Sequence, residues 1–149
     1  MPWIVEWYDW VGEHCVSPIP IAGEAEDSMA RFRQAKGEMI SREVIWPFKF
    51  ERFGITAGGK GYTKGKPNAM VYMVARGVFF APLKAKITLG SDDGSQLWLE
   101  PGKSLIENLG PHPYREVSQE LTLPPLVVLR LEFFDNCWSG GVKIEGPLW

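Results

Sequence analysis

Short stretches of alternating apolar and polar residues make up most of the chain. In Lys84–Leu89, two lysines and a threonine alternate with an alanine, an isoleucine and a leucine. A period of two places one set of side chains on a buried face of a strand and the other set in solvent. The 149 residues include 16 glycines and 12 prolines, which keep these stretches short. The pattern predicts an all-β protein.

We expect about eight strands from runs rich in β-branched and aromatic residues. They are Trp3–Trp10, Val44–Phe53 with its alternation after Pro47, Asn68–Ala75, Lys84–Leu89, Ser95–Glu100, Val117–Leu123, Val127–Phe134 and Gly141–Glu145. This number of strands suits an antiparallel β-sandwich, jelly-roll-like in its arrangement. The length suits one domain over residues 1–149.

The segment Glu24–Ile40 differs from the rest and predicts a short helix over one end of the sandwich. Asp27 or Ser28 is suited to cap its first turn. One side of this helix would carry its apolar residues, which are Met29, Phe32, Met39 and Ile40.

Charge and hydropathy exclude two classes of partner. The net charge is −2 and the basic residues are scattered, so no surface for a phosphate backbone is expected and nucleic acid is not a partner. The longest apolar stretches, Ala69–Ala75 and Leu126–Leu129, fall short of the roughly 18 residues that a membrane span needs. The segment Met1–Glu6 has no basic residues followed by an apolar core and already contains the carboxylate of Glu6, so no signal peptide is visible.

Catalytic patterns are thin, and we expect no enzymatic activity. His14 and His112 are the two imidazole bases of the chain. No Gly-x-Ser-x-Gly motif is present, and neither Cys15 nor Cys137 follows a pattern that would lower its pKa. Two buried thiols and one disulfide remain alternatives for these cysteines.

Two polar loops follow strongly apolar strands. In Leu89–Leu99, the adjacent Asp92 and Asp93 fit either a hairpin turn or a calcium site, because a divalent cation relieves the repulsion between neighbouring carboxylates. In Phe133–Gly141, Asn136 offers a side-chain carbonyl, and the glycines let main-chain carbonyls turn toward a ligand. A turn is the alternative here as well.

In order along the chain, these segments resemble the protective-antigen-type β-sandwich domain, a lectin-like module of adhesins, flocculins and some glycosidases. The Asp-Asp-Gly block within Ile87–Leu99 is the most specific part of the resemblance. The other matching segments are Trp3–Asp9, Val44–Trp46, Leu105–Gly110 and Leu129–Trp149. A departure is Glu100–Gly102, which stands where the family often has an Asp-Gly turn.

The resemblance implies a calcium site. In sugar-binding members, two aspartates joined by a cis peptide bond hold the ion, and a second loop adds an asparagine and main-chain carbonyls. The corresponding ligands here would be Asp92, Asp93 and Asn136, with the carbonyls of Trp138 and Gly140.

The resemblance also implies a ligand-binding surface beside the ion. Trp138 is the residue that the resemblance indicates. We add Trp10, which lies near a loop, together with Asn108 and His112, although an ordinary surface histidine is the alternative at His112. The Trp138 ring would stack on a sugar face, because an aromatic ring offers a flat apolar surface.

Three further expectations follow from the resemblance. Most of the seven tryptophans would belong to the core, and Trp46 and Trp149 would be among those that fill the space between the sheets. The first and last strands would lie side by side, which would favour a disulfide between Cys15 and Cys137.

The sequence thus predicts a calcium-dependent carbohydrate-binding or adhesion module without catalytic activity. Its partner would be a glycan or glycoconjugate, and its location extracellular or at a surface. The alternative is a non-catalytic structural subunit of a filament, virion or surface assembly, in which the chain forms a homo-oligomer or part of a larger complex.

Overall fold

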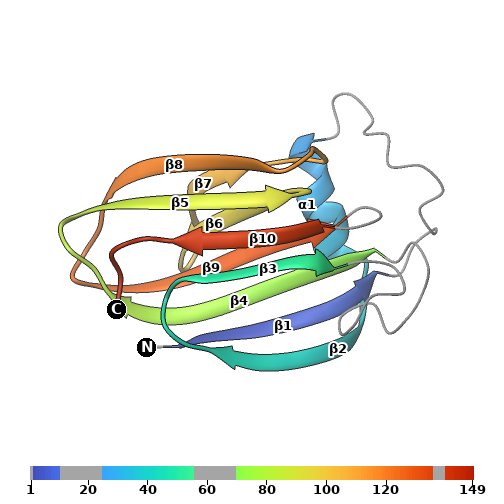
Figure 1. The fold of residues 1–149 in the computed structure, drawn as a ribbon, viewed down its shortest axis with the longest axis horizontal. Coiled ribbons are helices and arrows are strands. Elements are labelled where there is room, and N and C mark those ends of the chain that lie inside the picture. The colour runs from blue at the N-terminus through green and yellow to red at the C-terminus, as the bar shows by residue number, and fades with distance from the viewer. Residues whose placement is uncertain (1, 11–24, 56–69, 136–139) are drawn as a thin grey trace.

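Two antiparallel sheets form a sandwich in the computed structural model, which describes residues 2–10, 25–55, 70–135 and 140–149 (Figure 1). The larger sheet has the strand order β2-β1-β4-β9-β6-β7. Its members are β1 (Trp3–Trp10), β2 (Lys36–Ile45), β4 (Val71–Phe80), β6 (Ser95–Leu99), β7 (Lys103–Asn108) and β9 (Leu126–Asp135). The smaller sheet, in the order β3-β10-β5-β8, contains β3 (Phe50–Ile55), β5 (Lys84–Asp92), β8 (Arg115–Thr122) and β10 (Gly140–Glu145).

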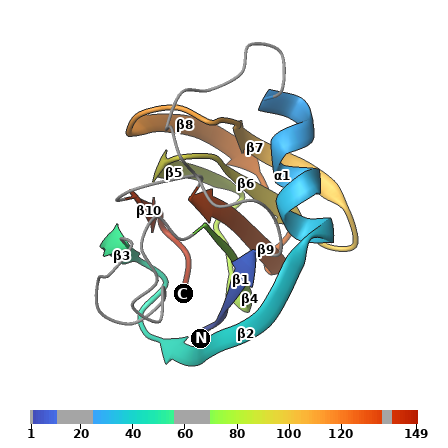
Figure 2. The same ribbon diagram turned by 90° about the vertical axis from the view of Figure 1, so that its right-hand side faces the viewer.

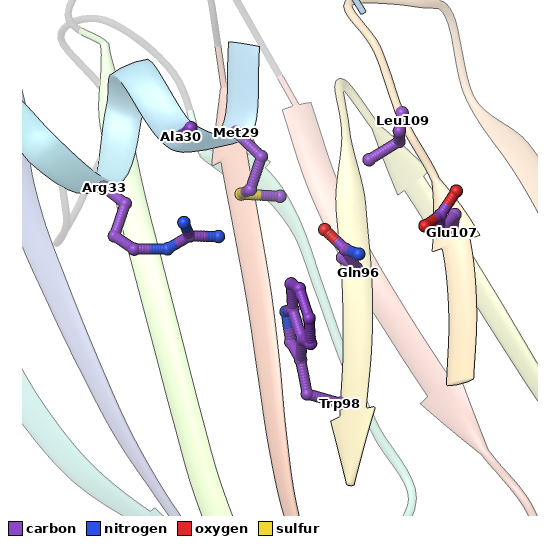
Figure 3. A pocket seen from close by; sticks show the side chains of 7 residues that line it. All are labelled: Met29, Ala30, Arg33, Gln96, Trp98, Glu107 and Leu109. Carbon is purple, nitrogen blue, oxygen red and sulfur yellow. The ribbon is translucent and has the colours of Figure 1, made fainter. Parts of the chain in front are cut away.

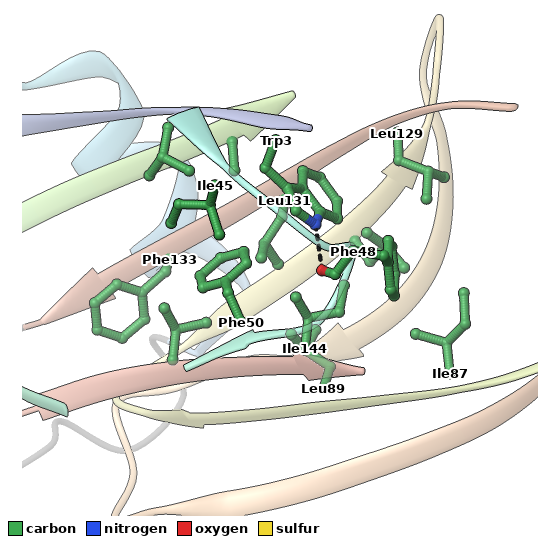
Figure 4. Packing of buried hydrophobic residues seen from close by; sticks show 14 of the residues in the cluster. Trp3, Ile45, Phe48, Phe50, Ile87, Leu89, Leu129, Leu131, Phe133 and Ile144 are labelled. Carbon is green, nitrogen blue, oxygen red and sulfur yellow. Dashed lines mark hydrogen bonds between the residues drawn. The ribbon is translucent and has the colours of Figure 1, made fainter. Parts of the chain in front are cut away.

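Alternating side chains build the core between the sheets. In β1, Trp3, Val5 and Trp7 are fully buried, whereas the residues between them face outward. The Trp3 indole N–H donates a 2.6 Å hydrogen bond to the main-chain oxygen of Phe48 (Figure 4). The Trp3 ring also lies 4.8 Å, centroid to centroid, from that of Phe79. The all-β sandwich predicted from the sequence is therefore confirmed.

One helix, α1 (Ala25–Gln34), covers part of the outer face of the larger sheet (Figure 2). Its Met29 and Phe32 pack against Tyr72, Val74 and Phe134, and the rings of Phe32 and Phe134 stack at 4.5 Å. At ten residues, α1 is too short to cross a bilayer, and the described part of the chain contains no candidate membrane helix.

The helix ends at Gln34, so the prediction of a helix over Glu24–Ile40 was wrong in its end and in its capping residue. It begins at Ala25, so Asp27 and Ser28 lie inside it and cannot be its N-cap. Met39 and Ile40 belong to β2 instead. Because β2 pairs with β1, with Met39 opposite Tyr8, the hydrogen bonds of the sheet override the local helical pattern.

The eight predicted strands all overlap strands of the structure, but β2 and β7 were not predicted as separate strands. Both are edge strands of the larger sheet. Their side chains are largely exposed or half-buried, so they lack the apolar alternation by which strands are recognised.

The first and last strands do not lie side by side, contrary to the expectation from the resemblance. β1 lies between β2 and β4 in the larger sheet, whereas β10 lies between β3 and β5 in the smaller one. Cys15 and Cys137 fall outside the described residues, so their pairing stays a prediction. Because β1 and β10 belong to different sheets, their arrangement does not favour a disulfide between these cysteines.

Two tryptophans expected in the core lie at the surface. Trp46 is 64% exposed and Trp149 is 60% exposed. Trp46 follows the end of β2, and Trp149 pairs through its main chain with Phe80 at the end of β4. Trp46 lies beyond the end of β2 and Trp149 beyond the end of β10, so neither belongs to the strand segments that form the core.

A buried ion pair fastens α1 to the sheet. Glu132 on β9 is fully buried, and it accepts hydrogen bonds from Arg33 Nε at 2.6 Å and Arg33 Nη2 at 2.9 Å. The Tyr72 hydroxyl donates to the same carboxylate. Burial raises the pKa of Glu132, but the hydrogen bonds from Arg33 and Tyr72 and the nearby cationic charges outweigh it and hold that pKa below its ordinary value.

This network predicts a pH dependence of stability. Because the pKa of Glu132 is lowered by folding, its contribution is present above the unfolded value of about 4.3 and is lost as the pH falls through the folded value. Urea unfolding of wild type and Glu132→Gln across pH 7 to 3 should show a difference in unfolding free energy that shrinks toward acid. A difference that stays constant or grows toward acid would contradict this assignment.

Candidate functional site

Asp92 and Asp93 lie where the chain passes from one sheet to the other. β5 ends at Asp92 in the smaller sheet, and β6 begins at Ser95 in the larger sheet. β5 pairs with β8 and β10, whereas β6 pairs with β7 and β9. The hairpin-turn alternative is therefore wrong, because a hairpin requires its two strands to pair with each other. We call residues 92–94 the crossover.

Buried hydrogen bonds hold both ends of the crossover. The hydroxyl oxygens of Ser91 and Ser95 lie 2.6 Å apart and are buried. The Asn108 amide nitrogen lies 3.3 Å from Ser91 Oγ and donates a 2.7 Å bond to the main-chain oxygen of Arg115. Arg115 Nε in turn donates to Asn108 Oδ1 at 2.9 Å. These bonds fix the positions of the residues on both sides of the crossover.

Asn108 and His112, both predicted to bind ligand, occupy different environments. Asn108 is fully buried and its amide serves the fold through the bonds above. His112 is half-buried, with ring nitrogens 2.6 Å and 3.0 Å from the main-chain oxygens of Pro113 and Asn108. Of these two, His112 has the surface that a ligand contact requires.

The carboxylates of the crossover are partly withdrawn from water. Asp93 is buried and Asp92 is half-buried. Burial raises the pKa of Asp92, and the charge of His112 opposes this shift without cancelling it. The peptide bond between Asp92 and Asp93 is cis, as the resemblance implied.

The start of β10 approaches the crossover so closely that only glycine fits there. Gly141 pairs with Asp92, and a Cβ on Gly140 would overlap the Asp92 main-chain oxygen. The same Cβ would lie 2.8 Å from the carboxylate of Asp135. Gly140 thus brings the ends of β5 and β9 together, which places Asp92 and Asp135 on either side of one backbone segment.

Asp135 was not predicted from the sequence. It is fully buried at the end of β9, and it continues the row of core residues formed by Leu129, Leu131 and Phe133. A carboxylate at the position where the alternation calls for an apolar residue is the signal that could have identified it.

Several predicted residues cannot be placed. Asn136, Cys137 and Trp138 fall outside the described residues, and the side chain of Trp10, at the end of β1, is not described either. Within the described residues, no three His, Cys, Asp or Glu side chains come close enough together to hold a metal ion. A complete ligand set would therefore need oxygens other than those of the described His, Cys, Asp and Glu side chains.

Neither a family model nor a curated protein matches this chain. Solved structures match it along its whole length. The PA14 sugar-binding domain from an RTX adhesin superposes with a TM-score of 0.67 at 14% identity, covering 99% of this chain and 89% of that one. The chain has the PA14 fold. This is the protective-antigen-type sandwich that the sequence resembled.

Other PA14-fold proteins differ in what surrounds the domain. The epithelial adhesin 6 A domain from Candida glabrata, in complex with Galβ1-3GlcNAc, has a TM-score of 0.57 at 10% identity and covers 99% of this chain and 78% of that one. A β-glucosidase from Kluyveromyces marxianus matches with a TM-score of 0.54 at 12% identity, but the match covers only 15% of that chain. The fold thus occurs both in adhesin domains and within a larger enzyme.

The close approach at Gly140 predicts a localised effect of substitution. Gly140→Ala should lower the unfolding free energy by about 1–3 kcal/mol, because the added methyl group forces apart Asp92 and Asp135. Gly102→Ala is the matched control, since a Cβ there meets nothing within 4 Å, and we expect a change within about 0.5 kcal/mol. Equal effects of the two substitutions in urea unfolding would refute the close packing at Gly140.

Proposed function

We propose that this chain is a non-catalytic carbohydrate-binding module that holds a glycan through a calcium ion at the crossover. The observation that carries the proposal is the placement of Asp92 and Asp93, side by side at the end of the sandwich and next to the start of β10. Carboxylate oxygens in this arrangement are the donors that calcium prefers.

The ligands of the ion would come from two segments. The crossover would supply the carboxylates of Asp92 and Asp93, and the second loop would supply Asn136 and the carbonyls of Trp138 and Gly140. The fit is supported by the tight packing at Gly140, which brings Gly140 itself next to the main chain of Asp92. A bound calcium ion would offer open positions to two vicinal sugar hydroxyls.

The residues of the chain would orient the sugar. Trp138 would present a flat apolar surface to the ring, and His112, half-buried beside Asp92, would face the same ligand. The adhesin neighbours support a role in recognition without catalysis and a location at the cell surface. Two adjacent aspartates are also poorly placed for glycosidic cleavage, which needs two carboxylates about 5 to 10 Å apart on either side of a cleft.

Calcium binding is tested by calorimetry on protein stripped with a chelator. We expect a dissociation constant between about 1 μM and 1 mM, a higher melting temperature with calcium, and loss of both in Asp93→Asn. Glu120→Gln is the control, because Glu120 is an exposed carboxylate on β8. If calcium produces no binding heat and no change in melting temperature, Asp92 and Asp93 have a structural role only.

A glycan array then separates metal binding from sugar binding. Wild type in millimolar calcium should bind a subset of glycans and lose them in chelator, and Asp92→Ala should lose them in calcium. An array that is silent in calcium, or one on which Asp92→Ala matches wild type, would refute the proposal.

A second candidate is a structural module that associates with further copies of itself. It is favoured by exposed apolar side chains on the part of the larger sheet that α1 leaves uncovered. These are Ile4, Val44, Val78, Phe80, Leu126 and Val128, among which Val78 pairs with Val128 and Phe80 with Leu126. Sedimentation should then show concentration-dependent association that Phe80→Lys weakens. A monomer at every concentration would exclude this candidate.

A further inference from the structure

We propose a second saccharide-binding site, independent of calcium, in the pocket between α1 and the larger sheet. The pocket has a volume of about 420 Å³, within the range of small-molecule sites. It lies on the outer face of the sheet, over β6 and β7 (Figure 3). Its lining residues are Met29, Ala30, Arg33, Gln96, Trp98, Glu107 and Leu109.

The charges around the pocket favour a neutral ligand. Glu132 pairs with Arg33, and Glu100 pairs with Arg130 at 3.1 Å, so both arginines already have a counter-ion. Glu107 adds a further negative charge at the wall opposite Arg33. An anion would meet the charge of Glu107, which none of these arginines balances. A polar ligand without net charge meets no such penalty, and Arg33, whose charge Glu132 balances, can still donate hydrogen bonds to it.

The polar groups offer both donors and acceptors. Arg33 donates hydrogen bonds from Nε and Nη2 to Glu132, and its side chain is still 39% exposed. The remaining N–H groups of its guanidinium can therefore reach a ligand. Gln96 Nε2 donates to Ser104 Oγ at 2.9 Å, which turns the amide oxygen toward α1 (Figure 3). Hydroxyl groups both donate and accept, so a polyhydroxylated ligand matches this mixture.

An aromatic ring and two apolar side chains complete the pocket. Trp98 is half-buried on β6, where Arg130 Cζ lies 5.0 Å from its ring centroid and holds the ring in place. Met29 and Leu109 approach from the helix and from beyond β7. The C–H groups of a sugar ring would pack mainly against Trp98 and Leu109, which are half-buried, because Met29 is 1% exposed.

The pocket is formed before any ligand binds. α1 is fixed to the sheet by the Arg33 ion pair and by the packing of Met29 and Phe32, and Gln96, Trp98 and Glu107 stand on paired strands. A rigid site loses little conformational entropy on binding. None of its polar groups requires a cation, so the site does not depend on the function proposed for the crossover.

The pocket can be closed by a single substitution. Ala30→Trp places a large side chain among the lining residues, whereas Gln34→Trp adds the same side chain at an exposed position on the same helix that does not line the pocket. Glu107→Gln, at an exposed position on β7, replaces the charged acceptor without changing the shape of the side chain.

The experiment follows the Trp98 indole N–H in two-dimensional NMR while neutral trisaccharides of glucose, mannose, galactose and N-acetylglucosamine are added in chelator. We expect a saturable shift with at least one trisaccharide, at a dissociation constant of about 1 mM. Gln34→Trp should retain the saturable shift, and Ala30→Trp should abolish it. Glu107→Gln should raise the dissociation constant about tenfold.

Two results would overturn this proposal. One is the absence of a saturable Trp98 shift with every trisaccharide in chelator. The other is an unchanged shift in both Ala30→Trp and Glu107→Gln, with folding of both variants verified by their melting curves. Calcium-dependent binding at the crossover is scored separately by Asp93→Asn, so failure of one site does not count as failure of the other.

Discussion

The buried side chain of Asn108 joins the two sheets at the end of the sandwich where Asp92 and Asp93 lie. It belongs to β7 of the larger sheet, yet it donates to the main chain of Arg115 and contacts Leu89 and Ser91, all in the smaller sheet. A buried amide with its partners in place is costly to disrupt, because any movement leaves polar groups unpaired. The position of the crossover depends on this constraint.

A second buried polar group organises the opposite face of the larger sheet. Glu132 contacts Arg33 on α1, Tyr72 on β4 and Arg130, whose guanidinium lies over the Trp98 ring. One carboxylate therefore fixes the helix, the neighbouring strand and this cation. The pocket between α1 and β6 exists because the helix is held at this distance by an ion pair as well as by Phe32. Both candidate sites are therefore supported by buried polar groups, which define specific geometry where apolar packing alone would allow variation.

The sequence could predict those parts of the fold that depend on local alternation. β5 alternates between exposed and buried side chains as Lys84–Leu89 predicted, and the acidic pair at its end was recognisable from adjacent residues. The edge strands β2 and β7 could not be predicted, because strands with few buried side chains carry a weak pattern. Asp135 left a signal, because it is a carboxylate at an apolar position of the alternation in β9. The pocket at Trp98 left none, since it joins residues far apart in the chain.

By itself, the sequence determined the class of the fold and the position of Asp92 and Asp93 between two apolar strands. Burial of alternate side chains requires apolar residues at alternate positions, so each strand can be recognised from its own segment of the sequence. Only the tertiary structure decided that these strands belong to different sheets, that β1 and β10 lie apart, and that Arg33 pairs with Glu132. These features depend on which strands pair and on which charges are buried together, and those choices are settled by the free energy of the whole chain.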